Sequence, residues 1–303
     1  MEIIPVIPRG YCKGVVNAIN LAKQCSYHYP NMPITALGMI VHNEYVVKAL
    51  EYLNIKTLDA KGKTRLELLD KIESGIVLFT AHGVSERVIQ KARQKGLICV
   101  DASCSDVICT QQKIKQRIQE GYTIFYIGQN GHPEAEAIVS SSDQVILIDS
   151  MQAVDHCSNS ITKVYVTNQT TMSIMEIDPL IQAIQKKYPT CLVEQEICNA
   201  TRMRQEAILR LENVDLLYVV GDPHSNNANK LKKIALNHDI PCVYLITDCS
   251  QLQLEQLKNH QRIAVTAGAS TPTYLTQQVI DVLQHYAKTK EWILPKIDLQ
   301  QML

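Results

Sequence analysis

The sequence lacks any apolar stretch of the roughly 20 residues that a membrane-spanning helix needs, and it does not start with a basic segment followed by a long apolar one. Lys plus Arg and Asp plus Glu both total 30, so the chain has no net charge and no basic run that would bind a polyanion. These absences argue against a membrane protein and against a nucleic-acid partner. We expect a cytoplasmic protein.

Several nucleotide-binding and metal-binding motifs are also missing. The sequence contains neither a G-x-x-x-x-G-K-[ST] loop nor a complete G-x-G-x-x-G, which leaves ATP and NAD with little support as ligands. It has no C-x-x-C pair, so neither a zinc finger nor the cysteine spacing of a bacterial ferredoxin is indicated.

Short β-branched runs alternate with longer segments of helical period, a pattern typical of βαβ units with parallel sheets. The sequence therefore predicts an α/β fold. Strands are expected at 2–7, 34–40, 75–81, 97–102, 123–128, 144–149, 163–168, 215–221, 241–246 and 262–268. Helices are expected at 15–25, 44–53, 85–96, 110–121, 174–188, 203–212, 228–238 and 272–288.

Three of the ten cysteines share one local frame. Cys12, Cys104 and Cys198 each follow a strand-like run and precede a helical segment, and they lie 92 and 94 positions apart. This weak threefold repetition predicts α/β domains over residues 1–104, 105–194 and 195–283, followed by a C-terminal tail over 284–303.

Thiolates at helix N-termini are favoured by the helix dipole, and soft sulfur ligands suit an iron–sulfur cluster. Three thiolates on a four-iron cluster would leave one iron open to a substrate oxygen. Any one of these cysteines taken alone is better explained as a buried core thiol. A zinc-dependent hydrolase or lyase and a non-catalytic redox or metal sensor remain as alternatives.

Polar residues follow several of the expected strands, where ligands of open α/β sheets collect. Three of them are the histidines His42, His82 and His132. Uncharged hydrogen-bond donors accompany them, namely Thr170, Thr171, Ser225, Asn227 and Ser270. Such a set can hold a phosphate or diphosphate without a Walker-type loop. Structural histidines and ordinary helix N-caps are the alternative for each residue taken singly.

The segment "GHPEAEA" places Glu134 two residues after His132, so both side chains could face one cleft and pass a proton. Glu136 is the competing carboxylate of the same segment. A favourable charge in the first turn of a helix is the alternative role for Glu134.

Together these motifs resemble those of the 4-hydroxy-3-methylbut-2-enyl diphosphate reductase family. "PRGYCKGV" is similar to its "PRGFCAGV", "IVHNEYVV" to "VVHNRYVV", "TAHGVS" to "SAHGVS" and "VDASCSDV" to "FDATCPLV". Further along, "GHPEAEA" is similar to "GHPEVEG", "NQTTMS" to "TQTTLS", "EICNATRMRQEA" to "DICYATTNRQEA" and "VTAGASTP" to "VTAGASAP". The motifs occur in the same order over almost the whole chain.

The resemblance implies three α/β domains arranged as a trefoil around a central cleft, with a C-terminal tail that packs back on the body. It implies a 4Fe-4S cluster held by Cys12, Cys104 and Cys198, with the fourth iron open to substrate. The implied reaction converts the allylic diphosphate substrate into isopentenyl and dimethylallyl diphosphate, the last step of the methylerythritol phosphate pathway. A ferredoxin or flavodoxin would donate the electrons.

The resemblance also assigns roles to single residues. It implies that Glu134, Thr170 and His132 are catalytic, with Glu134 as the proton source relayed through Thr170. The residues it implies for substrate binding are His42, His82, His132, Thr170, Ser225, Asn226, Asn227 and Ser270. Asn226 stands where the family commonly has a serine. Because asparagine can still donate a hydrogen bond, we expect altered geometry with binding retained.

Overall fold

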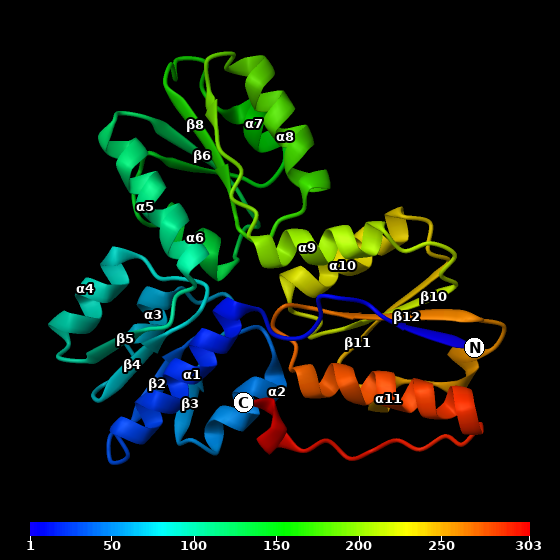
Figure 1. The fold of residues 1–303 in the computed structure, drawn as a ribbon. Coiled ribbons are helices and arrows are strands. Elements are labelled where there is room, and N and C mark those ends of the chain that lie inside the picture. The colour runs from blue at the N-terminus through cyan, green and yellow to red at the C-terminus, as the bar shows by residue number, and fades with distance from the viewer. The chain divides into compact units, whose positions relative to one another are not determined.

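Strands and helices alternate along the chain in the computed structural model, which describes residues 1–303 (Figure 1). The strands form three four-stranded sheets, and every pair of neighbouring strands is parallel. The predicted α/β class is confirmed. None of the helices combines the length and the apolar character that crossing a membrane requires.

The chain divides into two compact units. The first unit comprises Met1–Val16, Val41–Tyr52 and Asn199–Leu303, and the second comprises Asn17–Ile40 and Leu53–Cys198. Helix α1 (Lys13–His28) contributes residues to both units.

The second unit contains two of the three sheets. One sheet has the strand order β3 (Ile55–Leu58), β2 (Ile34–Leu37), β4 (Ile76–Phe79) and β5 (Ile98–Asp101). The other has the order β7 (Val145–Ile148), β6 (Thr123–Ile127), β8 (Val164–Asn168) and β9 (Leu192–Val193). The helices are α3 (Arg65–Leu69), α4 (Glu86–Gln94), α5 (Ser105–Gln119), α6 (Pro133–Val139), α7 (Met151–His156) and α8 (Ile174–Lys187).

Five of these elements were not among those expected from the sequence, namely β3, β9, α3, α6 and α7. None is longer than seven residues. A segment of that length is too short to display a clear hydrophobic period. Tertiary contacts therefore define these elements more than their own patterns do.

The first unit contains the third sheet, with the strand order β1 (Glu2–Pro5), β12 (Arg262–Ala267), β10 (Leu216–Val220) and β11 (Cys242–Ile246). Its further helices are α2 (Glu44–Glu51), α9 (Asn199–Leu209), α10 (Asn226–Asn237) and α11 (Thr273–Thr289), with 3-10 turns η1 (Cys249–Gln251), η2 (Leu254–Leu257) and η3 (Leu299–Met302).

The three sheets repeat one arrangement of edge strands. Strands β5 and β9 lie at the edges of their sheets, beside β4 and β8, and β1 occupies the equivalent edge beside β12. The sequence interpretation places residues 1–104 in one N-terminal domain, whereas Glu2 pairs with Arg262 and Pro5 with Val265 in the sheet of the last third. Parallel pairing between the two ends of the chain is not visible in local sequence. The domain limits themselves stay a prediction.

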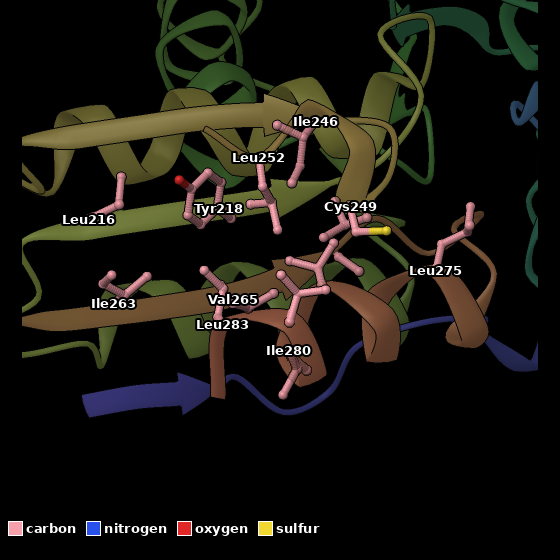
Figure 2. Packing of buried hydrophobic residues seen from close by; sticks show 14 of the residues in the cluster. Leu216, Tyr218, Ile246, Cys249, Leu252, Ile263, Val265, Leu275, Ile280 and Leu283 are labelled. Atoms are coloured by element: carbon pink, nitrogen blue, oxygen red, sulfur yellow. The ribbon is translucent and has the colours of Figure 1, made fainter. Parts of the chain in front are cut away.

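One face of this third sheet carries the largest apolar cluster of the first unit. Side chains at every second position of β10 and β12, such as Tyr218 and Val265, pack against Leu275, Ile280 and Leu283 of α11 (Figure 2). Successive side chains of a strand point to opposite faces of the sheet, so every second residue lies on the same face. Met302 of the C-terminal tail is fully buried in the same cluster, and η3 contacts α2 and α11.

Candidate active site

Each cysteine of the threefold frame occupies the same local position in the fold. It follows the edge strand of a sheet and directly precedes a helix, α1, α5 or α9. Its backbone N–H donates to a carbonyl in the loop after the neighbouring strand, and the three bonds are Cys12 to Ala269, Cys104 to Ala81 and Cys198 to Thr170, each 3.0 Å long. The shared frame read from the sequence thus corresponds to a shared backbone geometry.

None of the ten cysteines takes part in a disulfide, and the three of the shared frame are half-buried. Burial raises the pKa of five others, namely Cys25, Cys99, Cys157, Cys191 and Cys249. Those five are suited to packing as neutral thiols, whereas metal ligation requires a thiolate. Cys12 belongs to the first unit, and Cys104 and Cys198 belong to the second.

The turn before Cys12 depends on Gly10. This residue has a φ of 74°, and a Cβ atom built on it would lie 2.4 Å from Oγ1 of Thr273 in α11. Glycine is therefore required both by the left-handed backbone and by the close approach of α11. The Gly10 carbonyl also accepts a bond of 2.6 Å from the buried guanidinium of Arg204. These contacts hold the cysteine turn against α9 and α11.

In the second unit, Glu134 and Thr170 form a buried pair. Glu134 lies in the first turn of α6 and is 2 % exposed. Its Oε1 accepts the Thr170 backbone N–H at 2.8 Å, and its Oε2 accepts the Thr170 hydroxyl at 2.9 Å. A third donor, the hydroxyl of Tyr126 in β6, reaches Oε1 at 3.2 Å. Thr170 therefore connects Glu134 to Cys198, whose N–H bonds to the Thr170 carbonyl.

The environment of Glu134 favours the protonated carboxyl. Burial raises its pKa to about 7, although the hydrogen bonds from Thr170 and Tyr126 oppose this shift by stabilising the carboxylate. Asp106 at the start of α5 adds a repulsive negative charge and raises the pKa further. A carboxyl that titrates near neutral pH can give up and regain a proton under working conditions.

His132 caps the N-terminus of α6, and its Nδ1 accepts the Glu134 backbone N–H at 3.1 Å. An accepting Nδ1 carries no proton, so the neutral ring has its hydrogen on Nε2 and can donate from there. The His82 ring lies edge-on to the His132 ring, with 5.6 Å between centroids, and its Nδ1 is 3.2 Å from Oγ1 of Thr80. The two predicted histidines of the second unit are thus neighbours.

Glu136 does not share this environment. Its Oε1 accepts the backbone N–H of Arg65 at 2.7 Å, at the first residue of α3. The carboxylate therefore serves a helix start rather than the Thr170 loop. Of the two carboxylates in "GHPEAEA", Glu134 is the one that bonds to Thr170.

In the first unit, hydrogen bonds join three of the predicted ligand-binding residues. Ser225 caps the N-terminus of α10, and its Oγ lies 3.3 Å from Oγ of Ser270. Ser270 in turn donates to the His42 carbonyl at 3.1 Å, across 228 positions of sequence. The structure thus brings together residues from the loop before α2, the start of α10 and the loop before α11.

The Asn227 side chain is a buried amide at the start of α10. Its side chain is 5 % exposed, and neither its amide nitrogen nor its amide oxygen has a hydrogen-bond partner within the protein. Burial of an unsatisfied amide costs free energy unless a ligand or water completes it. Asn227 lies with Asn226 in the first turn of α10, where the positive end of the helix dipole favours an anion.

The first unit also has a small pocket of about 210 Å³, which none of the predicted ligand-binding residues lines. Its lining includes Asn43, the N-cap of α2, together with Asp222 and His224. Asp222 holds the two loops together, because its carboxylate accepts the backbone N–H groups of Glu44 at 3.0 Å and of His224 at 2.8 Å. The loop that carries His42 is therefore anchored to the loop before α10.

Two of the residues that shape these sites are not predicted by the sequence, namely Tyr126 and Asp222. Tyr126 lies inside an apolar strand and Asp222 in an ordinary strand-end loop, so neither has a motif of its own. The one available signal for Tyr126 is its position eight residues before Glu134 in a strand that leads into the same loop. Within each unit, no three His, Cys, Asp or Glu side chains gather closely enough to hold a single metal ion.

The chain matches the family model described as "LytB protein" over residues 3–284. It is 46 % identical over 290 residues to a protein of Brevibacillus brevis, a match that covers 94 % of this chain and 92 % of that protein. It is 44 % identical over 309 residues to a protein of Bacillus mycoides, with 100 % and 97 % covered. Both relatives are named 4-hydroxy-3-methylbut-2-enyl diphosphate reductase.

Solved structures agree with this grouping. The E-1-hydroxy-2-methyl-but-2-enyl-4-diphosphate reductase from Plasmodium falciparum matches with a TM-score of 0.87 and 28 % identity, covering 99 % of this chain and 96 % of that one. A second structure is described as (E)-4-hydroxy-3-methyl-but-2-enyl diphosphate reductase, the terminal enzyme of the non-mevalonate pathway. It matches with a TM-score of 0.65 and 27 % identity, covering 94 % and 100 % of the two chains.

Proposed function

The chain belongs to the LytB family of oxidoreductases, and we propose that it reduces 4-hydroxy-3-methylbut-2-enyl diphosphate to isopentenyl and dimethylallyl diphosphate, the last step of the non-mevalonate isoprenoid pathway. In this reaction the C–O bond of the allylic alcohol breaks, two electrons and two protons enter, and water leaves. A ferredoxin or flavodoxin supplies the electrons, and the enzyme works in the cytoplasm. The observation that carries the proposal is the buried Glu134–Thr170 pair.

The cofactor of the proposed enzyme is a 4Fe-4S cluster held by Cys12, Cys104 and Cys198. The donor set fits this group, because all three are half-buried cysteines outside any disulfide, directly before helices, and have one backbone geometry in common. Helix dipoles at these positions favour the thiolate that a cluster needs. When bound, the cluster would deliver the two electrons and offer one open iron to the substrate oxygen.

The diphosphate is bound by uncharged donors. In the first unit these are His42, Ser225, Asn226, Asn227 and Ser270, and in the second unit His82 and His132. The unpaired, buried amide of Asn227 at the start of α10 supports this role, because a phosphate oxygen would satisfy it. The Nε2–H of His132 adds a neutral donor. Asn226 retains a side-chain donor where the family commonly has serine.

Glu134 is the proton source, and Thr170 relays its proton toward the substrate. A pKa of about 7 keeps a large fraction of this carboxyl protonated at neutral pH. The Thr170 hydroxyl bonds directly to Oε2, so a proton can pass from the buried carboxyl to a hydroxyl without water. Burial of both side chains limits the access of bulk water to the pair.

The test is anaerobic purification followed by measurement of iron, acid-labile sulfide and visible absorption, and then turnover with dithionite and a viologen mediator. The proposal expects a brown protein with four iron and four sulfide per chain that consumes the allylic diphosphate. A colourless protein with stoichiometric zinc would favour a zinc-dependent hydrolase or lyase. A cluster protein that leaves the substrate unchanged would point to a sensor.

A further inference from the structure

The oxygens of Glu134 are not equivalent. Oε1 accepts two hydrogen bonds, one from the Thr170 backbone N–H at 2.8 Å and one from the Tyr126 hydroxyl at 3.2 Å. Oε2 accepts one, from the Thr170 hydroxyl at 2.9 Å. A carboxylate oxygen has two favourable acceptor positions in its plane. Both positions on Oε1 are therefore taken, and only Oε2 has room for a proton.

We infer that Tyr126 is a positioning residue that occupies Oε1 of Glu134, so that the carboxyl proton is carried on Oε2 and leaves through the Thr170 hydroxyl. This inference rests on the proposed function, since it concerns the proton source of that reaction. When Oε2 carries the proton, it donates to Oγ1 of Thr170, and the Thr170 hydroxyl is free to donate to an acceptor in the site. In the transfer, the Oε2–H bond breaks, a new Oγ1–H bond forms, and the former Thr170 proton moves to the acceptor.

The surroundings of Tyr126 hold its hydroxyl on Oε1 of Glu134. It is fully buried in β6 among Ile114, Ala135 and Ile138, so its ring has little freedom to turn the hydroxyl elsewhere. Burial and the neighbouring Glu134 carboxylate raise the pKa of Tyr126 well above its ordinary value. The phenol therefore stays protonated and acts only as a donor to the carboxylate, not as a proton source in its own right.

Without Tyr126, Oε1 would have a free acceptor position, and the proton could settle there, directed away from the Thr170 hydroxyl. The Tyr126 hydroxyl also stabilises the carboxylate form, so its loss raises the pKa of Glu134. The other titratable groups around this carboxyl are Asp106 on α5, His132 at the N-cap of α6 and His82 beside it, and all of them are kept when Tyr126 alone is changed.

The closing experiment compares Tyr126→Phe with a matched control, Tyr165→Phe. Tyr165 is equally buried in β8, belongs to the same apolar cluster and donates to another carboxylate, Glu194, at the same distance of 3.2 Å. Both variants remove one hydroxyl from a buried phenol. Only Tyr126→Phe should change the titration of Glu134.

The first readout is an infrared pH titration of the holoenzyme, which monitors the carbonyl stretch of the protonated Glu134 carboxyl. The band is assigned to Glu134 by its absence in Glu134→Gln. The midpoint should rise by about 0.5 to 1 pH unit in Tyr126→Phe, as expected for the loss of one hydrogen bond to a charged group. The midpoint should fall when 3-fluorotyrosine replaces Tyr126, because 3-fluorotyrosine is a stronger hydrogen-bond donor of nearly equal size. This second substitution serves as the test if Tyr126→Phe does not fold. An unchanged midpoint overturns the inference, whether or not the enzyme turns over the allylic diphosphate.

The second readout is turnover. The alkaline limb of the kcat profile should move to higher pH by the same amount in Tyr126→Phe, while kcat on the acidic plateau falls because part of the proton is misdirected. A uniform loss at every pH, with an unshifted limb, would assign Tyr126 a purely structural role. A wild-type enzyme that does not reduce the diphosphate would instead overturn the proposed function, and the infrared titration would still decide the role of Tyr126.

Discussion

The carbonyl oxygen of Thr170 accepts a hydrogen bond from the backbone N–H of Cys198 at 3.0 Å. The same residue holds Glu134 through its own N–H and its hydroxyl. Thr170 therefore links the proposed proton source, Glu134, to a proposed cluster ligand, Cys198, because it forms hydrogen bonds with both. Changes at either end can then be tested for their effect on the other.

Replacement of Glu134 by Gln should slow turnover by on the order of a hundredfold or more, because the amide cannot supply a proton. The Gln oxygen can accept the bonds from the Thr170 N–H and the Tyr126 hydroxyl, and its amide nitrogen can donate to Oγ1 of Thr170, so the fold should persist. Steady-state kinetics with an artificial reductant measure the loss, and iron content is the control. A variant as fast as wild type would remove Glu134 from the mechanism.

The same residue makes stability depend on pH. The pKa of Glu134 rises from 4.5 in a free chain to about 7 in the fold, so the native state binds more protons than the unfolded state between these values. Its contribution to stability is fully present below pH 4.5, decreases as pH rises and is lost above about 7. The corresponding change in the free energy of unfolding is about 3 kcal/mol.

Melting temperatures of wild type and Glu134→Gln, measured anaerobically from pH 5 to 8, should diverge in favour of the variant as pH rises. Parallel curves would contradict the shifted pKa.

Replacement of Cys104 by Ser should remove most of the iron and nearly all activity, because a hydroxyl is a much poorer ligand for iron than a thiolate. Cys109 offers a matched control, since it lies in α5, the helix that Cys104 precedes, but is exposed and outside the shared frame. Cys109→Ser should keep full iron content. Equal iron in the two variants, measured after anaerobic reconstitution, would exclude Cys104 from the ligand set.

Replacement of Asn227 by Ala should weaken substrate binding without weakening the fold. Its amide makes no hydrogen bond inside the protein, so truncation breaks none there, but one contact to the diphosphate is lost. The loss corresponds to about a tenfold rise in KM, or roughly 1.4 kcal/mol. The melting temperature should stay close to that of wild type.

Asn43→Ala provides the contrasting case in the same unit. The Asn43 side chain caps α2 by accepting the Val46 backbone N–H at 3.2 Å. Its removal should cost about 1 kcal/mol of stability. A large loss of stability in Asn227→Ala, comparable to that of the cap variant, would show that Asn227 has a structural role instead.

Much of the architecture could be predicted from local sequence. Long helices such as α8 and α11 have a clear apolar period, and strands such as β4 and β10 consist of apolar runs that are buried throughout. The strand-end histidines and the three cysteines stand out by residue type and by spacing. Short elements such as β9 and α7, with two and six residues, have no recognisable hydrophobic period, and the sequence does not predict them.

The sequence by itself determined the α/β class, the family and the identity of the polar residues at the strand ends, because periodicity and motif order are local properties of the chain. Only the tertiary structure decided that β1 completes the sheet of the last third, that Glu134 rather than Glu136 meets Thr170, and that Tyr126 reaches the same carboxyl. The physical reason is that burial and hydrogen bonding depend on which distant segments meet. The pKa of a carboxyl is set by those neighbours and not by the residues beside it in the sequence.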